Sequence, residues 1–244
     1  MFVAGGAALA GCAGATNALT VLSGLGIPTS HVTGNLTQLP VVVVQWDGAR
    51  LVVVVLMVLA FFVGAAISGA VVESTELRMG RRYGVLLLLA GAAIAAGAAA
   101  MQGGALGLGS GLVAMAAGIQ NAMATRMSAA VVRTTHMTGV VTDLGIALGK
   151  AIAGRGVDGW RVVLYLALLT GFAAGSLTGA VLHLRFGDTG LYAPAAAVVA
   201  LGVVYGRWRA GHVARGSAGG GSAGGGGSAA EGGSAGGRGG GAAT

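Results

Sequence analysis

Apolar segments long enough to cross a lipid bilayer recur along most of this chain. A helix needs about twenty apolar residues to cross the hydrocarbon core, and Gly, Pro and charged residues divide the chain into eight apolar segments. These are residues 3–26, 30–45, 50–72, 84–101, 105–126, 134–152, 161–183 and 189–207. Hydrophobic residues make up 55% of the 244 residues and charged residues 9%. The sequence therefore predicts an all-α integral membrane protein in a lipid bilayer.

The composition changes abruptly after Arg209. Residues 216–244 are Gly, Ala and Ser apart from Glu231, Arg238 and the last residue, which predicts a flexible, disordered Gly/Ala/Ser-rich cytoplasmic tail. We divide the chain into a first membrane repeat (1–102), a second membrane repeat (103–210) and this tail (211–244). The net charge of +7 is spread between the apolar segments, which indicates a topology signal and no nucleic-acid partner.

Cys12 is the one cysteine of the chain, so an internal disulfide and a multi-cysteine metal site are excluded. We expect no metal and no cofactor. The residues Leu9-Ala10-Gly11-Cys12 match the box that bacterial lipoprotein signal peptidase reads, and a cleaved, lipidated N-terminus is the alternative. Against it, residues 1–8 lack the Lys or Arg that begins a signal peptide.

The chain contains an internal repeat. Residues 30–39 align without gaps on residues 135–144, and five of the ten positions are identical. The identical pairs are His31 and His136, Thr33 and Thr138, Gly34 and Gly139, Thr37 and Thr142, Leu39 and Leu144. Upstream, Gly14, Asn17 and Ala18 match Gly118, Asn121 and Ala122; downstream, Ala60, Gly64 and Ser68 match Gly171, Gly175 and Gly179. The common order predicts two related halves, and small residues four apart predict helix-packing faces.

The basic residues indicate how the segments cross the membrane. If all eight cross, the two sides receive seven and six basic residues. If the segments 30–45 and 134–152 enter and leave on one side, eleven share a face, and only Arg50 and Arg185 lie opposite. The eleven are Arg78, Arg81, Arg82, Arg126, Arg133, Lys150, Arg155, Arg161, Arg207, Arg209 and Arg215. The positive-inside rule then predicts six transmembrane helices plus two re-entrant or broken helical segments, with both termini cytoplasmic. Three spans per half make two inverted 3+3 repeats.

The repeated motifs are the candidate site. Each begins with hydroxyl residues suited to cap a helix, Thr29 and Ser30 or Thr134 and Thr135. A helix that begins inside the membrane directs free N–H groups and a partial positive charge at what precedes it. We therefore predict a site for a small polar or anionic solute, and expect the two helix starts to meet. The expected substrate-binding residues are His31, Thr33, Asn35, His136, Thr138, Asn17 and Asn121. The alternative for His and Asn is a hydrogen bond between helices.

Asp143 is the one acidic residue well inside an apolar segment, and its counterpart in the first half, Gln38, cannot titrate. A carboxylate within the membrane usually pairs, binds a cation or carries a proton. We therefore predict that Asp143 is an ion-coupling residue. The alternative is a salt bridge to a nearby Arg.

The motifs Gly14-x-x-Asn17-Ala18 with Ser30-His31-x-Thr33-Gly34-Asn35, and Gly118-x-Gln120-Asn121-Ala122 with Thr135-His136-x-Thr138-Gly139, resemble the uncharacterised bacterial YoaK-like membrane family. The similarity covers about residues 10–208. It implies a multi-pass protein of the bacterial plasma (inner) membrane and supplies no substrate. Members of that family usually carry Asp where this chain has Asn17, so a role for an acid there does not carry over.

These features favour a secondary transporter or permeability protein for a small polar or anionic solute. An intramembrane enzyme is an alternative, because hydroxyls beside His31 and His136 could act as nucleophiles. The chain has no Gly-x-Ser-x-Gly or His-Glu-x-x-His element, and we expect that it is not an enzyme. A non-transporting scaffold, or a sensor whose His residues respond to pH, is the third reading. The solute is not specified, and a homo-oligomer remains open.

Overall fold

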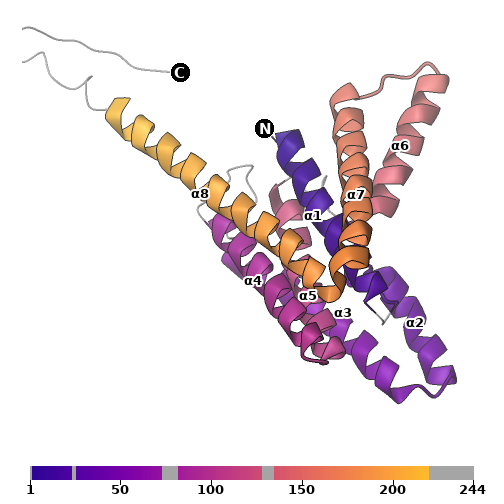
Figure 1. Ribbon diagram of the computed structural model, residues 1–244. Coiled ribbons are helices and arrows are strands. Elements are labelled where there is room, and N and C mark those ends of the chain that lie inside the picture. Colours follow the sequence, from indigo (N-terminus) through magenta and orange to yellow (C-terminus); the bar gives the residue numbers. More distant parts are fainter. Residues whose placement is uncertain (1, 24–25, 73–81, 128–134, 220–244) are drawn as a thin grey trace, which may run out of the picture. The chain divides into compact units, whose positions relative to one another are not determined.

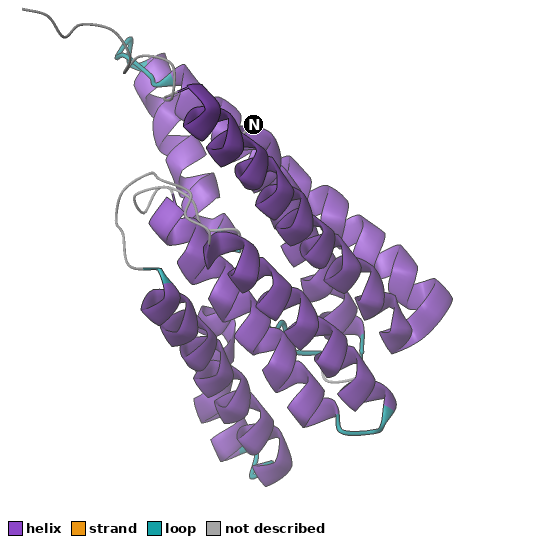
Figure 2. Ribbon diagram, turned by 90° about the vertical axis from the view of Figure 1, so that its left-hand side faces the viewer, coloured by secondary structure: helices purple, strands orange, loops and turns teal. Residues whose placement is uncertain are grey.

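The computed structural model of the chain describes residues 2–23, 26–72, 82–127 and 135–219 (Figure 1). Every regular element in these ranges is helical, and Figure 2 shows helices joined by short loops. The elements are α1 (Phe2–Leu22), α2 (Val32–Val44), α3 (Gly48–Val71), α4 (Arg82–Gln102), α5 (Leu106–Met127), α6 (Met137–Ile152), α7 (Gly159–Phe186), the short 3₁₀ helix η1 (Gly187–Leu191) and α8 (Tyr192–Gly219). The predicted all-helical class is confirmed, as expected where the backbone must satisfy its own hydrogen bonds in lipid.

The chain divides into two compact units, Met1–Arg207 and Trp208–Thr244. The predicted boundary between the membrane repeats, after residue 102, falls in the turn between α4 and α5. The predicted tail begins at residue 211, inside α8, which runs to Gly219. Its remainder, 220–244, lies outside the described residues, as do Arg78, Arg81, Arg133 and Thr134.

Five helical stretches are long and apolar enough to cross a bilayer. They are Val3–Leu22, Gly48–Val71, Arg82–Gln102, Leu106–Thr125 and Gly159–Ala210, the last of which holds both α7 and the first part of α8. The chain is therefore a multi-pass membrane protein. α2 and α6 have only 13 and 16 residues, about 20 and 24 Å of helix against a hydrocarbon core of about 30 Å.

Helix α1 packs against α7, and α3 packs against α5. Both contacts depend on glycine at the same repeated position. A Cβ added to Gly14 would collide with the carbonyl oxygen of Phe172, and a Cβ added to Gly118 would collide with that of Phe61. Because Phe61 and Phe172 occupy equivalent positions beside the aligned ladders, the two helix pairs share one register.

The partner helices supply a second pair of close approaches. A Cβ on Gly175 would collide with the Gly11 carbonyl, and a Cβ on Gly64 would collide with the Met115 carbonyl. Contacts advance in the same direction along both helices of each pair, so the helices are parallel. The small-residue faces predicted from the sequence thus allow backbone-to-backbone packing.

Two small apolar clusters hold the short helices in place. One contains Leu39 of α2 with Val53, Val54, Met57 and Phe61 of α3. The other contains Leu144 of α6 with Leu164, Tyr165, Leu168 and Phe172 of α7. The two sets occupy equivalent positions in the repeat, so each short helix forms a hairpin with the long helix that follows it.

Candidate functional site at the two helix breaks

At each break between a long helix and the short helix that follows it, an asparagine side chain forms hydrogen bonds with the residue just before the short helix. We call this pair of bonds the asparagine fastening. Asn17 Oδ1 on α1 accepts hydrogen bonds from the Ser30 hydroxyl at 3.0 Å and the Ser30 N–H at 3.4 Å. Asn121 Oδ1 on α5 accepts from the Thr135 N–H at 3.2 Å, and its Nδ2 donates to the Thr135 hydroxyl at 2.6 Å. The amide oxygen of each Asn is thus occupied by its own half of the chain. These bonds favour a positioning role for both residues.

The residues that begin the short helices are His31 and His136, and neither side chain caps its helix. Both side chains are exposed. A Cβ added to Gly34 or Gly139 would collide with the ring of the histidine three residues earlier. Each ring therefore lies against the first turn of its helix, and the repeated glycine leaves room for it.

The predicted hydroxyl caps are wrong at Thr29, Ser30 and Thr135, and Thr134 lies outside the described residues. Because the helices begin at the histidines, Ser30 and Thr135 lie one residue too early for their hydroxyls to reach the first-turn N–H groups. They pair with the asparagines instead, and the Thr29 hydroxyl lies 3.2 Å from the Thr20 hydroxyl on α1. The first-turn N–H groups of α2 and α6 are left without side-chain caps.

Thr33 and Thr138 lie on the exposed side of the first helical turns. Their carbonyls accept hydrogen bonds from the hydroxyls of Thr37 and Thr142, each at 2.9 Å. A stripe of hydroxyl side chains thus runs along both short helices, and its second hydroxyl is satisfied by the helix backbone in each.

Asn35 is buried on the opposite side of α2, with 1% of its surface exposed. Its Nδ2 donates to the Pro28 carbonyl at 3.2 Å, whereas its Oδ1 has no hydrogen-bond partner. The equivalent residue on α6 is the buried Val140. A buried oxygen without a partner is unusual, and it distinguishes the first break from the second.

Asp143 lies half-buried on α6, and Tyr165 is buried on α7. Both residues line a pocket of about 200 Å³ between these helices. The ion pair found in the hairpin joins Arg161 Nε to Asp158 Oδ2 at 3.3 Å, so the arginine that lines this pocket is paired with another acid. Among the described residues, no three His, Cys, Asp or Glu side chains gather as a metal site.

The structure brings each motif together with the asparagine and glycine of its own half. Within the part of the chain that it describes, it gives no contact between His31 and His136; α2 packs on α3, and α6 on α7. The expected meeting of the two helix starts therefore stays a prediction.

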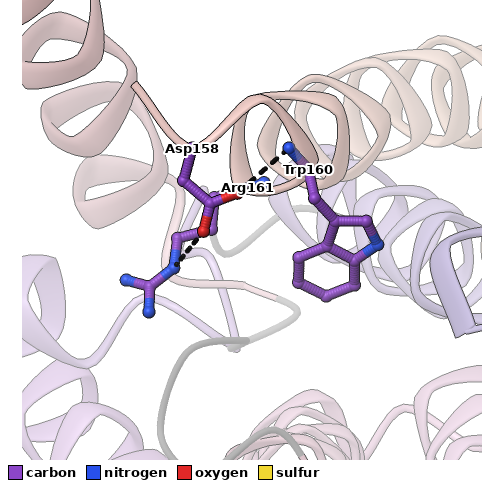
Figure 3. A network of polar contacts seen from close by, with 3 residues as sticks. All are labelled: Asp158, Trp160 and Arg161. Carbon is purple, nitrogen blue, oxygen red and sulfur yellow. Dashed lines mark hydrogen bonds and ion pairs between the residues drawn. The ribbon is translucent and has the colours of Figure 1, made fainter. Parts of the chain in front are cut away.

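A third repeated element escaped the sequence analysis. Asp47 accepts from the Arg50 N–H at 2.9 Å at the start of α3. Asp158 accepts from the N–H groups of Trp160 and Arg161 at the start of α7 (Figure 3). The signal is an Asp-Gly-x-Arg pattern present in both halves. The second half has six additional residues between the histidine motif and this pattern, in the α6–α7 connection. An ungapped alignment of the two halves therefore does not align the two copies of the pattern.

The sequence matches, over residues 5–204, the family described as protein of unknown function DUF1275. The chain belongs to this family. The match covers both helix breaks and both hairpins, and it confirms the predicted membership of an uncharacterised family. No curated protein and no solved structure matches the chain. For this DUF1275 protein, an assignment of function therefore depends on the geometry of the site.

Proposed function

We propose that this protein is a secondary transporter or related permeability protein for a small polar or anionic solute in the bacterial plasma membrane. The observation that supports this most is the repeated break, with Asn17 holding Ser30 and Asn121 holding Thr135. Non-helical backbone inside a membrane is tolerated only when it is buried in protein or lines a wet cavity. Two breaks with the same fastening are typical of binding sites between transporter repeats.

The chemistry of the helix starts favours an anionic or carbonyl-bearing group. First-turn N–H groups without side-chain caps are donors that need an acceptor, and the helix dipole adds a partial positive charge. His31 and His136 stand beside these groups with exposed rings that can donate or accept a hydrogen bond. Asn17 and Asn121 would hold the breaks open for the solute.

The proposed topology has six spans, with α2 and α6 re-entrant and both termini cytoplasmic. In Figure 1, α1 and α7 descend whereas α3 and α5 rise. The equivalent helices α1 and α5 thus run in opposite directions, as do α3 and α7. This supports an inverted 3+3 repeat, and the eleven-to-two division of basic residues supports the cytoplasmic termini.

Cysteine labelling tests this topology. In a Cys12→Ala background, single cysteines are introduced by Trp46→Cys in the α2–α3 turn and Arg155→Cys in the α6–α7 connection. We expect an impermeant maleimide added to intact cells to label the first variant and not the second. Labelling of both from one side would contradict the six-span topology.

Flux in proteoliposomes tests the function. The probes are radiolabelled L-alanine, succinate and phosphate, with empty liposomes as the blank. We expect protein-dependent uptake of at least one probe, and a loss of about tenfold or more in His31→Ala with His136→Ala. His212→Ala is the control, since this histidine lies outside both repeated motifs. Uptake that survives the double variant would contradict the assigned site, and binding without flux would favour a scaffold or sensor.

A further inference from the structure

The pocket between α6 and α7 is a second candidate site, separate from the helix starts. Its volume of about 200 Å³ holds several waters, which leaves room for a small solute. The polar side chains of its lining are Asp143, Lys150, Asp158, Arg161 and Tyr165. Apolar residues of α6 close one wall.

Two of the four charged groups, Asp158 and Arg161, pair with each other, and the other two do not. Asp158 is occupied by two backbone N–H groups and by Arg161 Nε, and Figure 3 shows the terminal nitrogens of Arg161 directed away from it. Lys150 has no ion pair in the part of the chain that the structure describes. Asp143 likewise forms no ion pair within the described ranges, and the pocket residue opposite it on α7 is the uncharged Tyr165. One negative and one positive group therefore remain unmatched, seven residues apart on one face of α6, about 10 Å along its axis.

The α2–α3 hairpin provides an internal comparison. Gln38, Gln45 and Val54 occupy the positions of Asp143, Lys150 and Tyr165, while Asp47 and Arg50 keep the positions of Asp158 and Arg161. The capping pair is therefore common to both hairpins, and the three ionisable groups of the pocket are specific to one. Since the first hairpin forms with neutral residues, folding does not require these groups.

We propose that the α6–α7 pocket binds a small zwitterion. Its ammonium group is held by Asp143 and Tyr165, and its carboxylate or phosphate by Lys150 and the terminal nitrogens of Arg161. A zwitterion offers a partner to both unmatched groups, whereas a ligand with a single charge offers a partner to only one. A free amino acid and an aminophospholipid headgroup share this chemistry. If the ligand is a solute free in solution, zwitterions are the solute class of the proposed transport. Only this step rests on the proposed function, and binding to the pocket does not.

The test measures binding in detergent, where no flux is needed. L-alanine and O-phosphoethanolamine are titrated against the full chain. The readouts are the thermal unfolding temperature and the intrinsic tryptophan fluorescence, to which Trp160 contributes. Propionate and ethylammonium are the matched fragments, each with one of the two charges of L-alanine. We expect a zwitterion to bind at least about tenfold more tightly than either fragment. A second arm compares phosphatidylglycerol nanodiscs with and without phosphatidylethanolamine and so identifies a lipid as the source.

The variants Asp143→Asn and Lys150→Gln should each weaken zwitterion binding by about tenfold or more. Arg50→Gln, at the equivalent of Arg161 in the first hairpin, should leave it unchanged. Tyr165→Phe keeps the packing volume and should weaken binding less than Asp143→Asn. Equal affinity for the zwitterions and their fragments, or affinity that persists in Lys150→Gln, would overturn the proposal. Binding without uptake in proteoliposomes would retain the pocket and reject the transport function.

Discussion

The α2–α3 hairpin is neutral where the α6–α7 hairpin is charged, although both are built on the same supports. In each hairpin the short helix begins at a histidine whose side chain does not cap it, and a glycine follows three residues later. The long helix that comes next is capped by an aspartate. The two hairpins differ at three equivalent positions: Gln38, Gln45 and Val54 in one, Asp143, Lys150 and Tyr165 in the other. The first alone carries the buried Asn35.

This difference separates structural from functional residues. Features that occur in both hairpins serve the fold that both share, such as the asparagine fastenings and the glycine contacts. Features confined to one hairpin cannot be explained by that fold. The unpartnered oxygen of Asn35 and the unmatched charges of the α6–α7 pocket fall in this second class, where sites for solute or ions are expected.

The largest expected effect tests whether the two helix pairs are equivalent. Gly64→Ala and Gly175→Ala each place a methyl group against a backbone carbonyl, which cannot move as a side chain would. Both should lower the free energy of unfolding in detergent by about 1–3 kcal/mol, and by similar amounts. Gly69→Ala is the control, because nothing lies within 4 Å of its added Cβ. A strong effect at only one of the two glycines would break the comparison.

Much of this fold could be predicted from apolar segments and the repeat. Each of the eight predicted segments overlaps one of the helices α1 to α8, since an apolar run in lipid must satisfy its backbone hydrogen bonds within itself. The pairing of α1 with α7 could not be predicted, because a ladder such as Gly171, Gly175, Gly179 identifies a packing face and not its partner. The helix starts were placed too early because Thr29 and Ser30 satisfy a capping pattern but bond to α1.

The candidate site was predictable to a lesser degree. The repeat identified His31, His136, Asn17 and Asn121, but the role of the asparagines depends on contacts over 13 and 14 residues. The α6–α7 pocket brings together residues of two helices across a connection whose length differs between the halves. A single sequence gives no measure of which α7 residue faces Asp143, so Tyr165 was missed.

The second prediction exchanges the buried residues Asn35 and Val140 between the hairpins. Val140→Asn places an amide at a buried position whose native residue offers no hydrogen bond, and it should lower the free energy of unfolding by about 2 kcal/mol. Asn35→Val should change it by less than about 1 kcal/mol, because the lost bond to Pro28 is offset by removal of the unpartnered Oδ1. Thermal unfolding in detergent measures both. A large loss for Asn35→Val would mean that its oxygen is satisfied, which would remove Asn35 from the functional class.

The third prediction concerns the fastenings that the hairpins share. Asn17→Ala and Asn121→Ala each remove at least two hydrogen bonds and should lower the free energy of unfolding by about 1–2 kcal/mol. Asn17→Asp keeps the acceptor for Ser30 and should be tolerated. Hydrogen exchange would detect faster opening at the Ser30 and Thr135 amides. Unchanged exchange in the alanine variants would contradict a positioning role.

The smallest effect on stability is expected where the histidine rings rest on glycine. In Gly34→Ala and Gly139→Ala the added methyl group meets a side chain that is exposed and can swing away. Alanine also favours a helix by about 1 kcal/mol over glycine, so the free energy of unfolding should change by less than that amount. If the ring position serves solute binding, flux should nevertheless fall severalfold, and equally in both variants if both breaks bind solute.

Gly145→Ala on α6, with open space at its Cβ, controls for helix propensity, since it gains the same propensity without displacing a histidine. Normal flux in Gly34→Ala and Gly139→Ala would show that the ring position has no part in transport.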